Sequence, residues 1–167
     1  GTVALSNVTV TQNHASAEGG GVSNGPGTVK LTNTIVGGNS ATGIGPDCRG
    51  DLTSGGYNLI QDPGSCNIGG DLTGNVTGVG PALGPLANNG GPTETHAFLA
   101  NSPAIDTASP AAPGSGGNAC ESTDQRGVIR PQGPRCDMGA FEAEPVVGNN
   151  PPTAFDDVYQ MQQGDTL

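Results

Sequence analysis

Residues 1–13, GTVALSNVTVTQN, return as GTVKLTNTIVGGN at residues 27–39, and the two stretches align without a gap. Hydrophobic side chains alternate with polar ones in each copy, a pattern typical of a half-buried β-strand. Asn7 and Asn33 follow these strands, and asparagine favours a turn there because it tolerates the left-handed backbone conformation. A strand and fixed turn residues that repeat about every 20–30 residues are typical of a β-solenoid. The repeat therefore predicts two coils of one stack.

Stacking places equivalent residues of successive coils above one another. The sequence therefore predicts that Asn7 lies over Asn33 and Asn13 over Asn39. Such asparagine pairs form ladders of amides in stacked β-structures. We assign these asparagines a structural role.

A weaker repeat continues the pattern beyond the second coil. GDLTSGGYNLI, from residue 50, and GDLTGNVTGVG, from residue 70, both begin with Gly-Asp-Leu-Thr. We expect Leu52 and Leu72 at equivalent inward positions, with Leu59 and Ile60 continuing the core. Residues 1–80 are thus predicted to form about three or four coils.

The composition is compatible with such a stack. The chain has 167 residues, with 30 Gly, 14 Pro and only 3% aromatic residues. Glycine clusters separate short apolar runs, as turns do between strands, and stacked narrow coils need few large side chains. The net charge of −10 excludes a basic surface for nucleic acid and disfavours anionic membrane surfaces. No apolar run is long enough for membrane insertion.

The four cysteines suggest two disulfides. Cys48 and Cys66 bracket one glycine-rich loop, and Cys120 and Cys136 bracket another. Four cysteines allow three pairings, of which we predict Cys48–Cys66 and Cys120–Cys136. A zinc site is the alternative, but the sequence has no Cys-x-x-Cys motif. Disulfides indicate a location outside the cytosol.

The sequence changes character after the coils. Residues 81–143 are rich in proline and small apolar residues, and we expect an irregular, disulfide-stapled C-terminal cap of the stack. A cap is expected because an open end exposes apolar side chains and unpaired strand edges. Residues 144–167 are predicted to form a linker and an extended orphan strand.

A few polar residues outside the repeat pattern have local interpretations. Asn7 and Asn75 each begin an N-glycosylation sequon. Arg126 and Asp137 belong to the densest charged group of the chain, where we expect them to form a structural ion pair. His96 is expected to be a structural histidine with a satisfied hydrogen bond.

Five motifs occur in a characteristic order: LTNTIVGGNSA, SGGYNLI, GPLANNGGPTETHAFLANSPAID, TDQRGVIRP and CDMGAFE. Together they resemble the C-terminal region of large bacterial surface proteins of the polymorphic outer-membrane-protein or choice-of-anchor type. The resemblance covers roughly residues 1–143. It implies a right-handed parallel β-helix without catalytic activity, in a secreted or surface-displayed bacterial protein. From residue 149, NNPPTAFDDVYQMQQGDTL resembles the first strand of cadherin-like or immunoglobulin-like domains.

Enzymes are the main alternative, because polysaccharide lyases and glycosidases also use parallel β-helices. A glycosidase needs two carboxylates about 5–9.5 Å apart. Glu18 and Lys30 are the only charged residues before Asp47. Asp51 and Asp71 are candidates to stack at equivalent corners, but no base or aromatic residue accompanies them. We therefore expect no catalytic residue, no metal site and no cofactor.

The expected function is a non-enzymatic extracellular structural or adhesin-like module. The first coil begins directly at Gly1, with no cap before it, and the last strand lacks a domain to join. Both features predict head-to-tail self-assembly into a filament or surface layer, by coil stacking or strand addition. The expected contact residues are Gly1, Thr2, Val3, Leu5, Val8, Val10, Phe155, Val158 and Tyr159.

Other partners and functions are left open by the sequence. Neighbouring domains of a longer surface protein are an alternative to other copies of the chain. A β-helix lyase or glycosidase, or a non-catalytic glycan-binding module, is the alternative function. Asp156 and Asp157 are a weak candidate Ca²⁺ site, since hard cations prefer carboxylate ligands.

Overall fold

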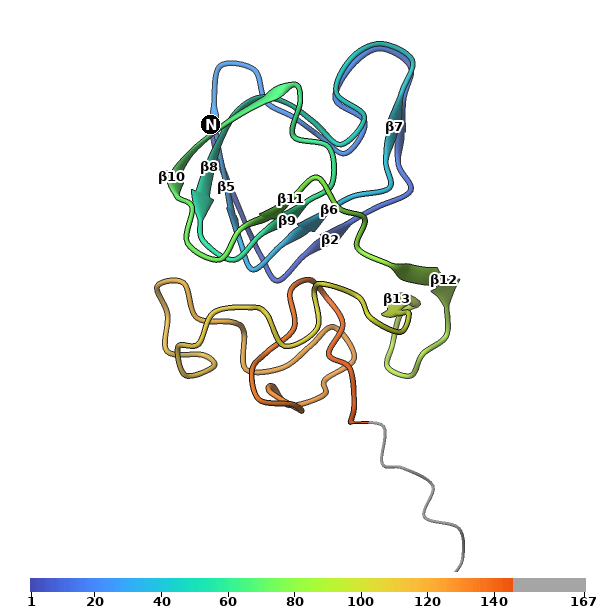
Figure 1. Cartoon of the computed structure of the whole chain (residues 1–167), viewed down its shortest axis with the longest axis vertical. Helices are drawn as coiled ribbons and strands as arrows, with labels where there is room; N and C mark the ends of the chain where they lie inside the picture. The colour runs from blue at the N-terminus through green and yellow to red at the C-terminus, as the bar shows by residue number, and fades with distance from the viewer. Residues whose placement is uncertain (146–167) are drawn as a thin grey trace, which may run out of the picture.

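The computed structural model describes residues 1–145. Within this range the chain is all-β, with strands and loops but no helix (Figure 1). The predicted linker and final strand fall almost entirely outside the described residues. The same holds for the expected contact and calcium residues Phe155, Val158, Tyr159, Asp156 and Asp157.

The chain makes four similar passes, each of which contributes at least one strand to each of two sheets. The first pass contains β1 (Thr2–Ser6), β2 (Thr9–Val10) and β3 (His14–Ala15), and the second contains β4 (Val22–Ser23), β5 (Thr28–Thr32), β6 (Ile35–Val36) and β7 (Ser40–Ala41). The third contains β8 (Cys48–Gly55) and β9 (Leu59–Ile60), and the fourth contains β10 (Cys66–Asp71) and β11 (Val76–Thr77). A hairpin of β12 (Leu83–Ala87) and β13 (Thr95–Phe98) follows.

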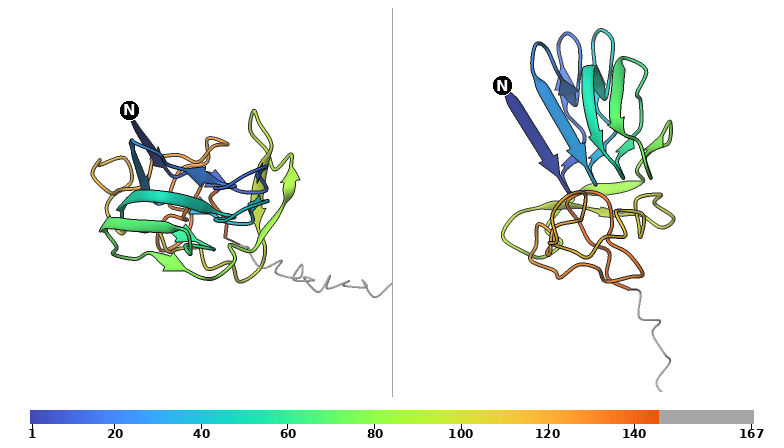
Figure 2. Two further views of the ribbon diagram at one scale, coloured as in Figure 1. Left: turned by 90° about the horizontal axis from the view of Figure 1, so that it is seen from above. Right: turned by 90° about the vertical axis from the view of Figure 1, so that its left-hand side faces the viewer.

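The two main sheets are parallel and follow the order of the passes. Their strand orders are β1-β5-β8-β10 and β2-β6-β9-β11, so that the passes lie side by side (Figure 2). Thr2 pairs with Thr28 and Leu5 with Leu31, in the register of the gapless alignment. The predicted adjacency of the first two copies is therefore confirmed.

The register of the later passes differs from the prediction. Leu52 pairs with Ile68, not with Leu72, and Leu72 is 55% exposed. Asp51 pairs with Asn67, so it does not stack on Asp71 either. The cause is a short third pass, which lacks a counterpart of β3 and β7 and therefore returns to the first sheet early.

The first hydrophobic core lies inside the passes, between the two sheets. It contains Leu31, Val36, Cys48, Leu52 and Ile60. The predicted core position of Ile60 is thus confirmed.

The second core lies on the outer face of β6 and β9. There Ile35 and Leu59 pack against Ala104, Ala108, Cys120, Cys136 and Met138 of the later chain. The short strands β6 and β9 are therefore buried on both faces. This explains why each consists of two consecutive apolar residues rather than an alternating pair.

Both predicted disulfides are present. Cys48–Cys66 and Cys120–Cys136 have Cα–Cα distances of 5.7 and 6.6 Å. Two disulfides are typical of an oxidising, extracellular environment. Residues 1–145 contain no helix that is long and apolar enough to cross a membrane.

The bend between the two sheets recurs in every pass. Asn7, Asn33, Tyr57 and Gly74 have φ values of 50°, 49°, 59° and 66°. The predicted left-handed conformation of Asn7 and Asn33 is confirmed. Tyr57 adopts the same conformation, although a bulky residue rarely does so.

The amide ladders lie only partly where the repeat predicts them. Asn13 donates from Nδ2 to Oδ1 of Asn39 at 2.9 Å, as expected. A second ladder runs one residue after the bend, where the backbone N–H of Thr34 donates to Asn58 Oδ1 at 3.0 Å. The N–H of Asn58 donates in turn to Asn75 Oδ1 at 2.9 Å.

Candidate functional site

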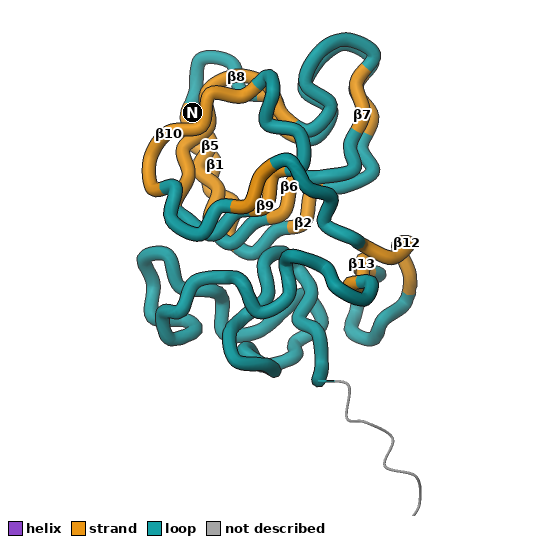
Figure 3. The backbone as a smooth tube through the Cα atoms, viewed as in Figure 1, coloured by secondary structure: helices purple, strands orange, loops and turns teal. Residues whose placement is uncertain are grey.

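Residues 99–145, here called the flanking segment, lie along the side of the passes. They are mostly loops in Figure 3, and in the right-hand view of Figure 2 they run beneath the ends of the first sheet's strands. The sequence predicts a cap over the end of the stack. The segment instead covers the apolar outer faces of Ile35 and Leu59.

The bend asparagines attach the flanking segment to the passes. Asn7 donates from Nδ2 to the carbonyl of Asp137 at 3.3 Å and accepts the N–H of Glu121 at 2.9 Å. Asn33 donates to the carbonyl of Asn118 and accepts the N–H of Ser109, each at 2.9 Å. The predicted Asn7–Asn33 ladder is therefore wrong, because both amides serve the segment instead.

A buried ion pair lies inside the flanking segment. Nη1 of Arg130 is 2.8 Å from Oε2 of Glu142, and the two side chains are 0% and 1% exposed. Arg130 also donates to the carbonyls of Asp137 and Gly139. Glu142 accepts the N–H groups of Gln132 and Asp137. Charges this deeply buried are stable only with such partners.

A second buried pair joins Asp124 and Arg126, 2.8 Å apart. The Arg126 guanidinium also lies 3.7 Å from the centre of the Phe141 ring. The predicted pair of Arg126 with Asp137 is thus wrong. Burial raises the pKa of Asp124, but hydrogen bonds from Glu142, Val128 and Arg126 outweigh it, and the pKa lies below its usual value.

Asp137 is a buried carboxyl group that joins two parts of the flanking segment. Its two oxygens accept the N–H groups of Asp106 at 2.7 Å and Ala143 at 2.6 Å. Burial, together with the charges of Glu142 and Asp106, nevertheless raises its pKa to about 7, against the effect of these two donors.

Asp137 gives the fold a dependence on pH. Its pKa is raised above the unfolded value, so its contribution to stability is full at low pH and is lost as the pH rises through about 7. We expect the free energy of unfolding to fall by on the order of 2 kcal/mol between pH 5 and pH 8. Urea denaturation across this range measures the slope.

Asp137→Asn is the control for this pH dependence. The variant has a lower stability overall, because its amide cannot accept both N–H groups, but its slope between pH 5 and pH 8 flattens. An unchanged slope in the variant would assign the titration to another group.

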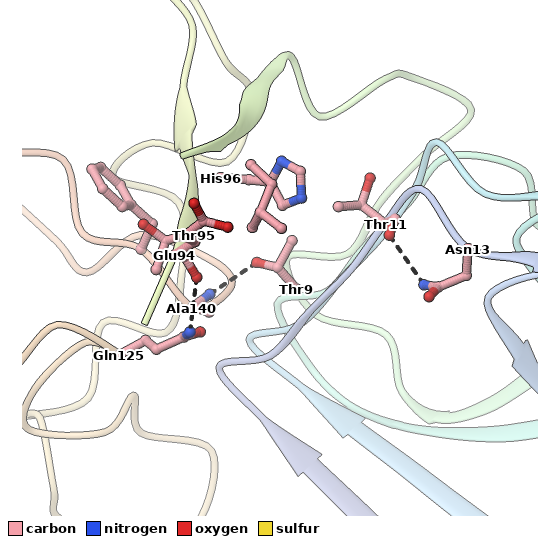
Figure 4. A pocket seen from close by; sticks show the side chains of 10 residues that line it. Thr9, Thr11, Asn13, Glu94, Thr95, His96, Gln125 and Ala140 are labelled. Atoms are coloured by element: carbon pink, nitrogen blue, oxygen red, sulfur yellow. Dashed lines mark hydrogen bonds between the residues drawn. The ribbon is translucent and has the colours of Figure 1, made fainter. Parts of the chain in front are cut away.

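A groove opens between the first pass and the β12–β13 hairpin (Figure 4). Its volume is about 260 Å³, and its lining is Thr9, Thr11, Asn13, Leu86, Glu94, Thr95, His96, Gln125, Ala140 and Phe141. Nδ1 of His96 lies 2.8 Å from the carbonyl of Gly84, which confirms its expected hydrogen bond. The N–H of Ala140 donates to Thr9 Oγ1 at 3.0 Å, so this wall is fixed to the flanking segment.

The chemistry available in the groove is limited. Glu94 is the one carboxylate in its lining, whereas glycoside hydrolysis requires a pair. Within the described part of the chain, no group of three or more His, Cys, Asp and Glu side chains is arranged to hold a metal. The lining offers hydroxyl, amide and imidazole groups for hydrogen bonds.

The expected contact residues of the first coil gather along β1 and β2. Gly1, Thr2 and Val3 are exposed, and Leu5, Val8 and Val10 are half-buried. They form the outermost side of the first pass, where β1 pairs with β5 alone among the described strands. Their role in contacts with other copies stays a prediction.

The two sequons do not present free amides. Asn7 Nδ2 donates to the flanking segment, and Asn75 Nδ2 donates to Ser54 Oγ at 3.0 Å. Attachment of a glycan to either nitrogen in the folded protein requires these interior contacts to break.

Comparison of the chain with protein-family models, curated proteins and solved structures finds no match. The geometry of the chain itself is therefore the basis of a functional assignment.

Proposed function

We propose that the chain is a non-enzymatic structural module of an extracellular protein. In this proposal its passes form a short right-handed parallel β-helix, and further copies associate head-to-tail through the outer edge of the first pass. The observation that carries the proposal is the outer edge of β1, which pairs with β5 in the register of the repeat and with no other strand of residues 1–145. The resemblance of five motifs to bacterial surface proteins supports the location.

The backbone of β1 offers hydrogen bonds on this edge. In a parallel sheet, alternate residues serve opposite neighbours. Gly1 accepts the N–H of Thr28, and the N–H of Asn7 donates to Thr32, so the odd-numbered residues serve β5. The N–H and C=O groups of the even-numbered residues Thr2, Ala4 and Ser6 therefore face outward.

Some side chains of β1 occupy inward positions that no further strand of residues 1–145 covers. Val3 is 52% exposed, whereas its partner Val29 in the next pass is half-buried. At the other end of the stack, Ile68 of β10 continues the inward positions. If β1 of one copy pairs with β10 of another in the existing register, Val3 lies beside Ile68. Such a contact does not close on itself and extends into a filament.

The association is tested with the whole chain in solution. Light scattering after size exclusion is expected to show a mass that grows with concentration, and negative-stain images are expected to show filaments. Val3→Lys places a charge on the edge strand and is expected to weaken association at least about tenfold. Ile44→Lys is the matched control, because Ile44 is 57% exposed but belongs to the loop between β7 and β8. A wild-type chain that stays monomeric at high concentration would refute the proposal.

A further inference from the structure

The side-chain amides that line the groove between the first pass and the β12–β13 hairpin have used their N–H groups within the fold. Nδ2 of Asn13 donates one hydrogen to Oδ1 of Asn39 and the other to a nearby backbone carbonyl. Nε2 of Gln125 donates to Thr93 Oγ1 at 2.8 Å and to the carbonyl of Glu94 at 3.3 Å. Neither amide therefore has an N–H left for a ligand, whereas the oxygen of each amide accepts no bond from residues 1–145.

His96 also presents an acceptor to the groove. Its Nδ1 lies 2.8 Å from the carbonyl oxygen of Gly84, and because a carbonyl can only accept, Nδ1 carries the hydrogen. The other ring nitrogen, Nε2, is then an acceptor in the neutral ring, and it has no partner among the described residues. The ring lies between Glu94 and Thr11 in Figure 4, so this acceptor belongs to the groove.

The charge of the groove has the same preference. Glu94 is exposed, and its carboxylate forms no ion pair with residues 1–145. The lining contains neither Lys nor Arg from this part of the chain. A carboxylate beside unoccupied neutral acceptors favours a ligand that is positively charged and rich in hydrogen-bond donors. A metal ion fits less well, because no third His, Cys, Asp or Glu side chain of the described residues joins Glu94 and His96.

From this inventory we infer that the groove binds an amino sugar, with the ammonium group at Glu94. An ammonium group supplies a positive charge and several N–H donors, which the carboxylate and the neighbouring acceptors require. The groove also suits the rest of the sugar. The hydroxyl of Thr9 accepts the N–H of Ala140 and keeps its own hydrogen for a ligand oxygen. Leu86, which is 53% exposed, offers an apolar contact to the C–H groups of the ring.

The size of the groove matches a single sugar unit. Its volume is about 260 Å³, whereas sites for drug-sized ligands measure about 300–1,000 Å³. The whole lining comes from one copy of the chain, so the inference does not depend on the proposed head-to-tail association.

Saturation-transfer difference NMR with the full chain tests this site, because it observes the ligand whether the chain is single or assembled. D-glucosamine is expected to bind at least about tenfold more tightly than D-glucose, which has a hydroxyl in place of the ammonium group. Butylamine, which has the ammonium group but no ring, is also expected to bind about tenfold more weakly than glucosamine. Equal affinities of glucosamine and either comparison compound, or no saturable binding of glucosamine, would overturn the inference.

Glu94→Gln locates the binding in the groove. The substitution keeps the shape of an exposed side chain but removes its charge, and it is expected to weaken glucosamine binding about tenfold while the affinity for glucose stays the same. Glu121→Gln is the matched control, since it makes the same change of charge at an exposed residue outside the lining. Glucosamine binding that survives Glu94→Gln, or that falls equally with Glu121→Gln, would place the sugar elsewhere and contradict the site.

Discussion

Glu142→Ala is expected to lower the free energy of unfolding by about 3–5 kcal/mol, as is typical when one partner of a buried ion pair is removed. The guanidinium of Arg130, which is fully buried, would lose its countercharge. The N–H groups of Gln132 and Asp137 would lose their acceptor as well. Urea denaturation followed by circular dichroism at constant pH measures the change.

Glu144→Ala is the matched control for Glu142→Ala. Glu144 is 66% exposed and lies 3.9 Å from Arg126, so its removal is expected to change the stability by less than about 0.5 kcal/mol. If Glu142→Ala cost less than about 1 kcal/mol, the flanking segment would not depend on its buried pair.

Ile35→Ala is expected to cost about 2–5 kcal/mol of stability, the usual range for a large aliphatic residue removed from a core. Ile35 is 0% exposed and belongs to the core between β6 and the flanking segment. The cavity would weaken the attachment of the segment in particular. Hydrogen exchange is therefore expected to quicken at the amide of Met138, which is bonded to the carbonyl of Ala104.

Ile129→Ala is the comparison for Ile35→Ala, because it removes the same atoms from a side chain that is 69% exposed. Its effect is expected to stay within about 0.5 kcal/mol. Equal effects of the two substitutions would contradict the placement of the second core on the outer face of β6.

Sequence reasoning located the first two passes because both have the same length. Equal spacing puts Leu5 beside Leu31 without any knowledge of the loops. The third pass was predicted as well, but the register of the fourth pass on it was not, because the third pass is shorter and changes the offset. A local match of four residues, Gly-Asp-Leu-Thr, then suggested Leu72 where the sheet contains Ile68.

The partners of the charged residues were harder to predict than the disulfides. A cysteine can form a disulfide only with one of the other three, so the length of the loop between two cysteines discriminates well among the three possible pairings. Each carboxylate of the flanking segment has several cations and backbone donors within reach, and burial decides among them. The motif at residues 123–142 contained Arg130 and Glu142, but only the folded loops show that they meet.

The bond between Asn7 and Asp137 joins residues 130 positions apart in the chain. Contacts over such separations form slowly, because the loop between them must close first. During synthesis the strands β6 and β9 emerge long before the segment that covers their outer faces. The outer faces of Ile35 and Leu59 therefore stay exposed to solvent until the residues that cover them, from Ala104 to Met138, have been made. The first bend of the chain, at Asn7, is among the last to form its hydrogen bonds.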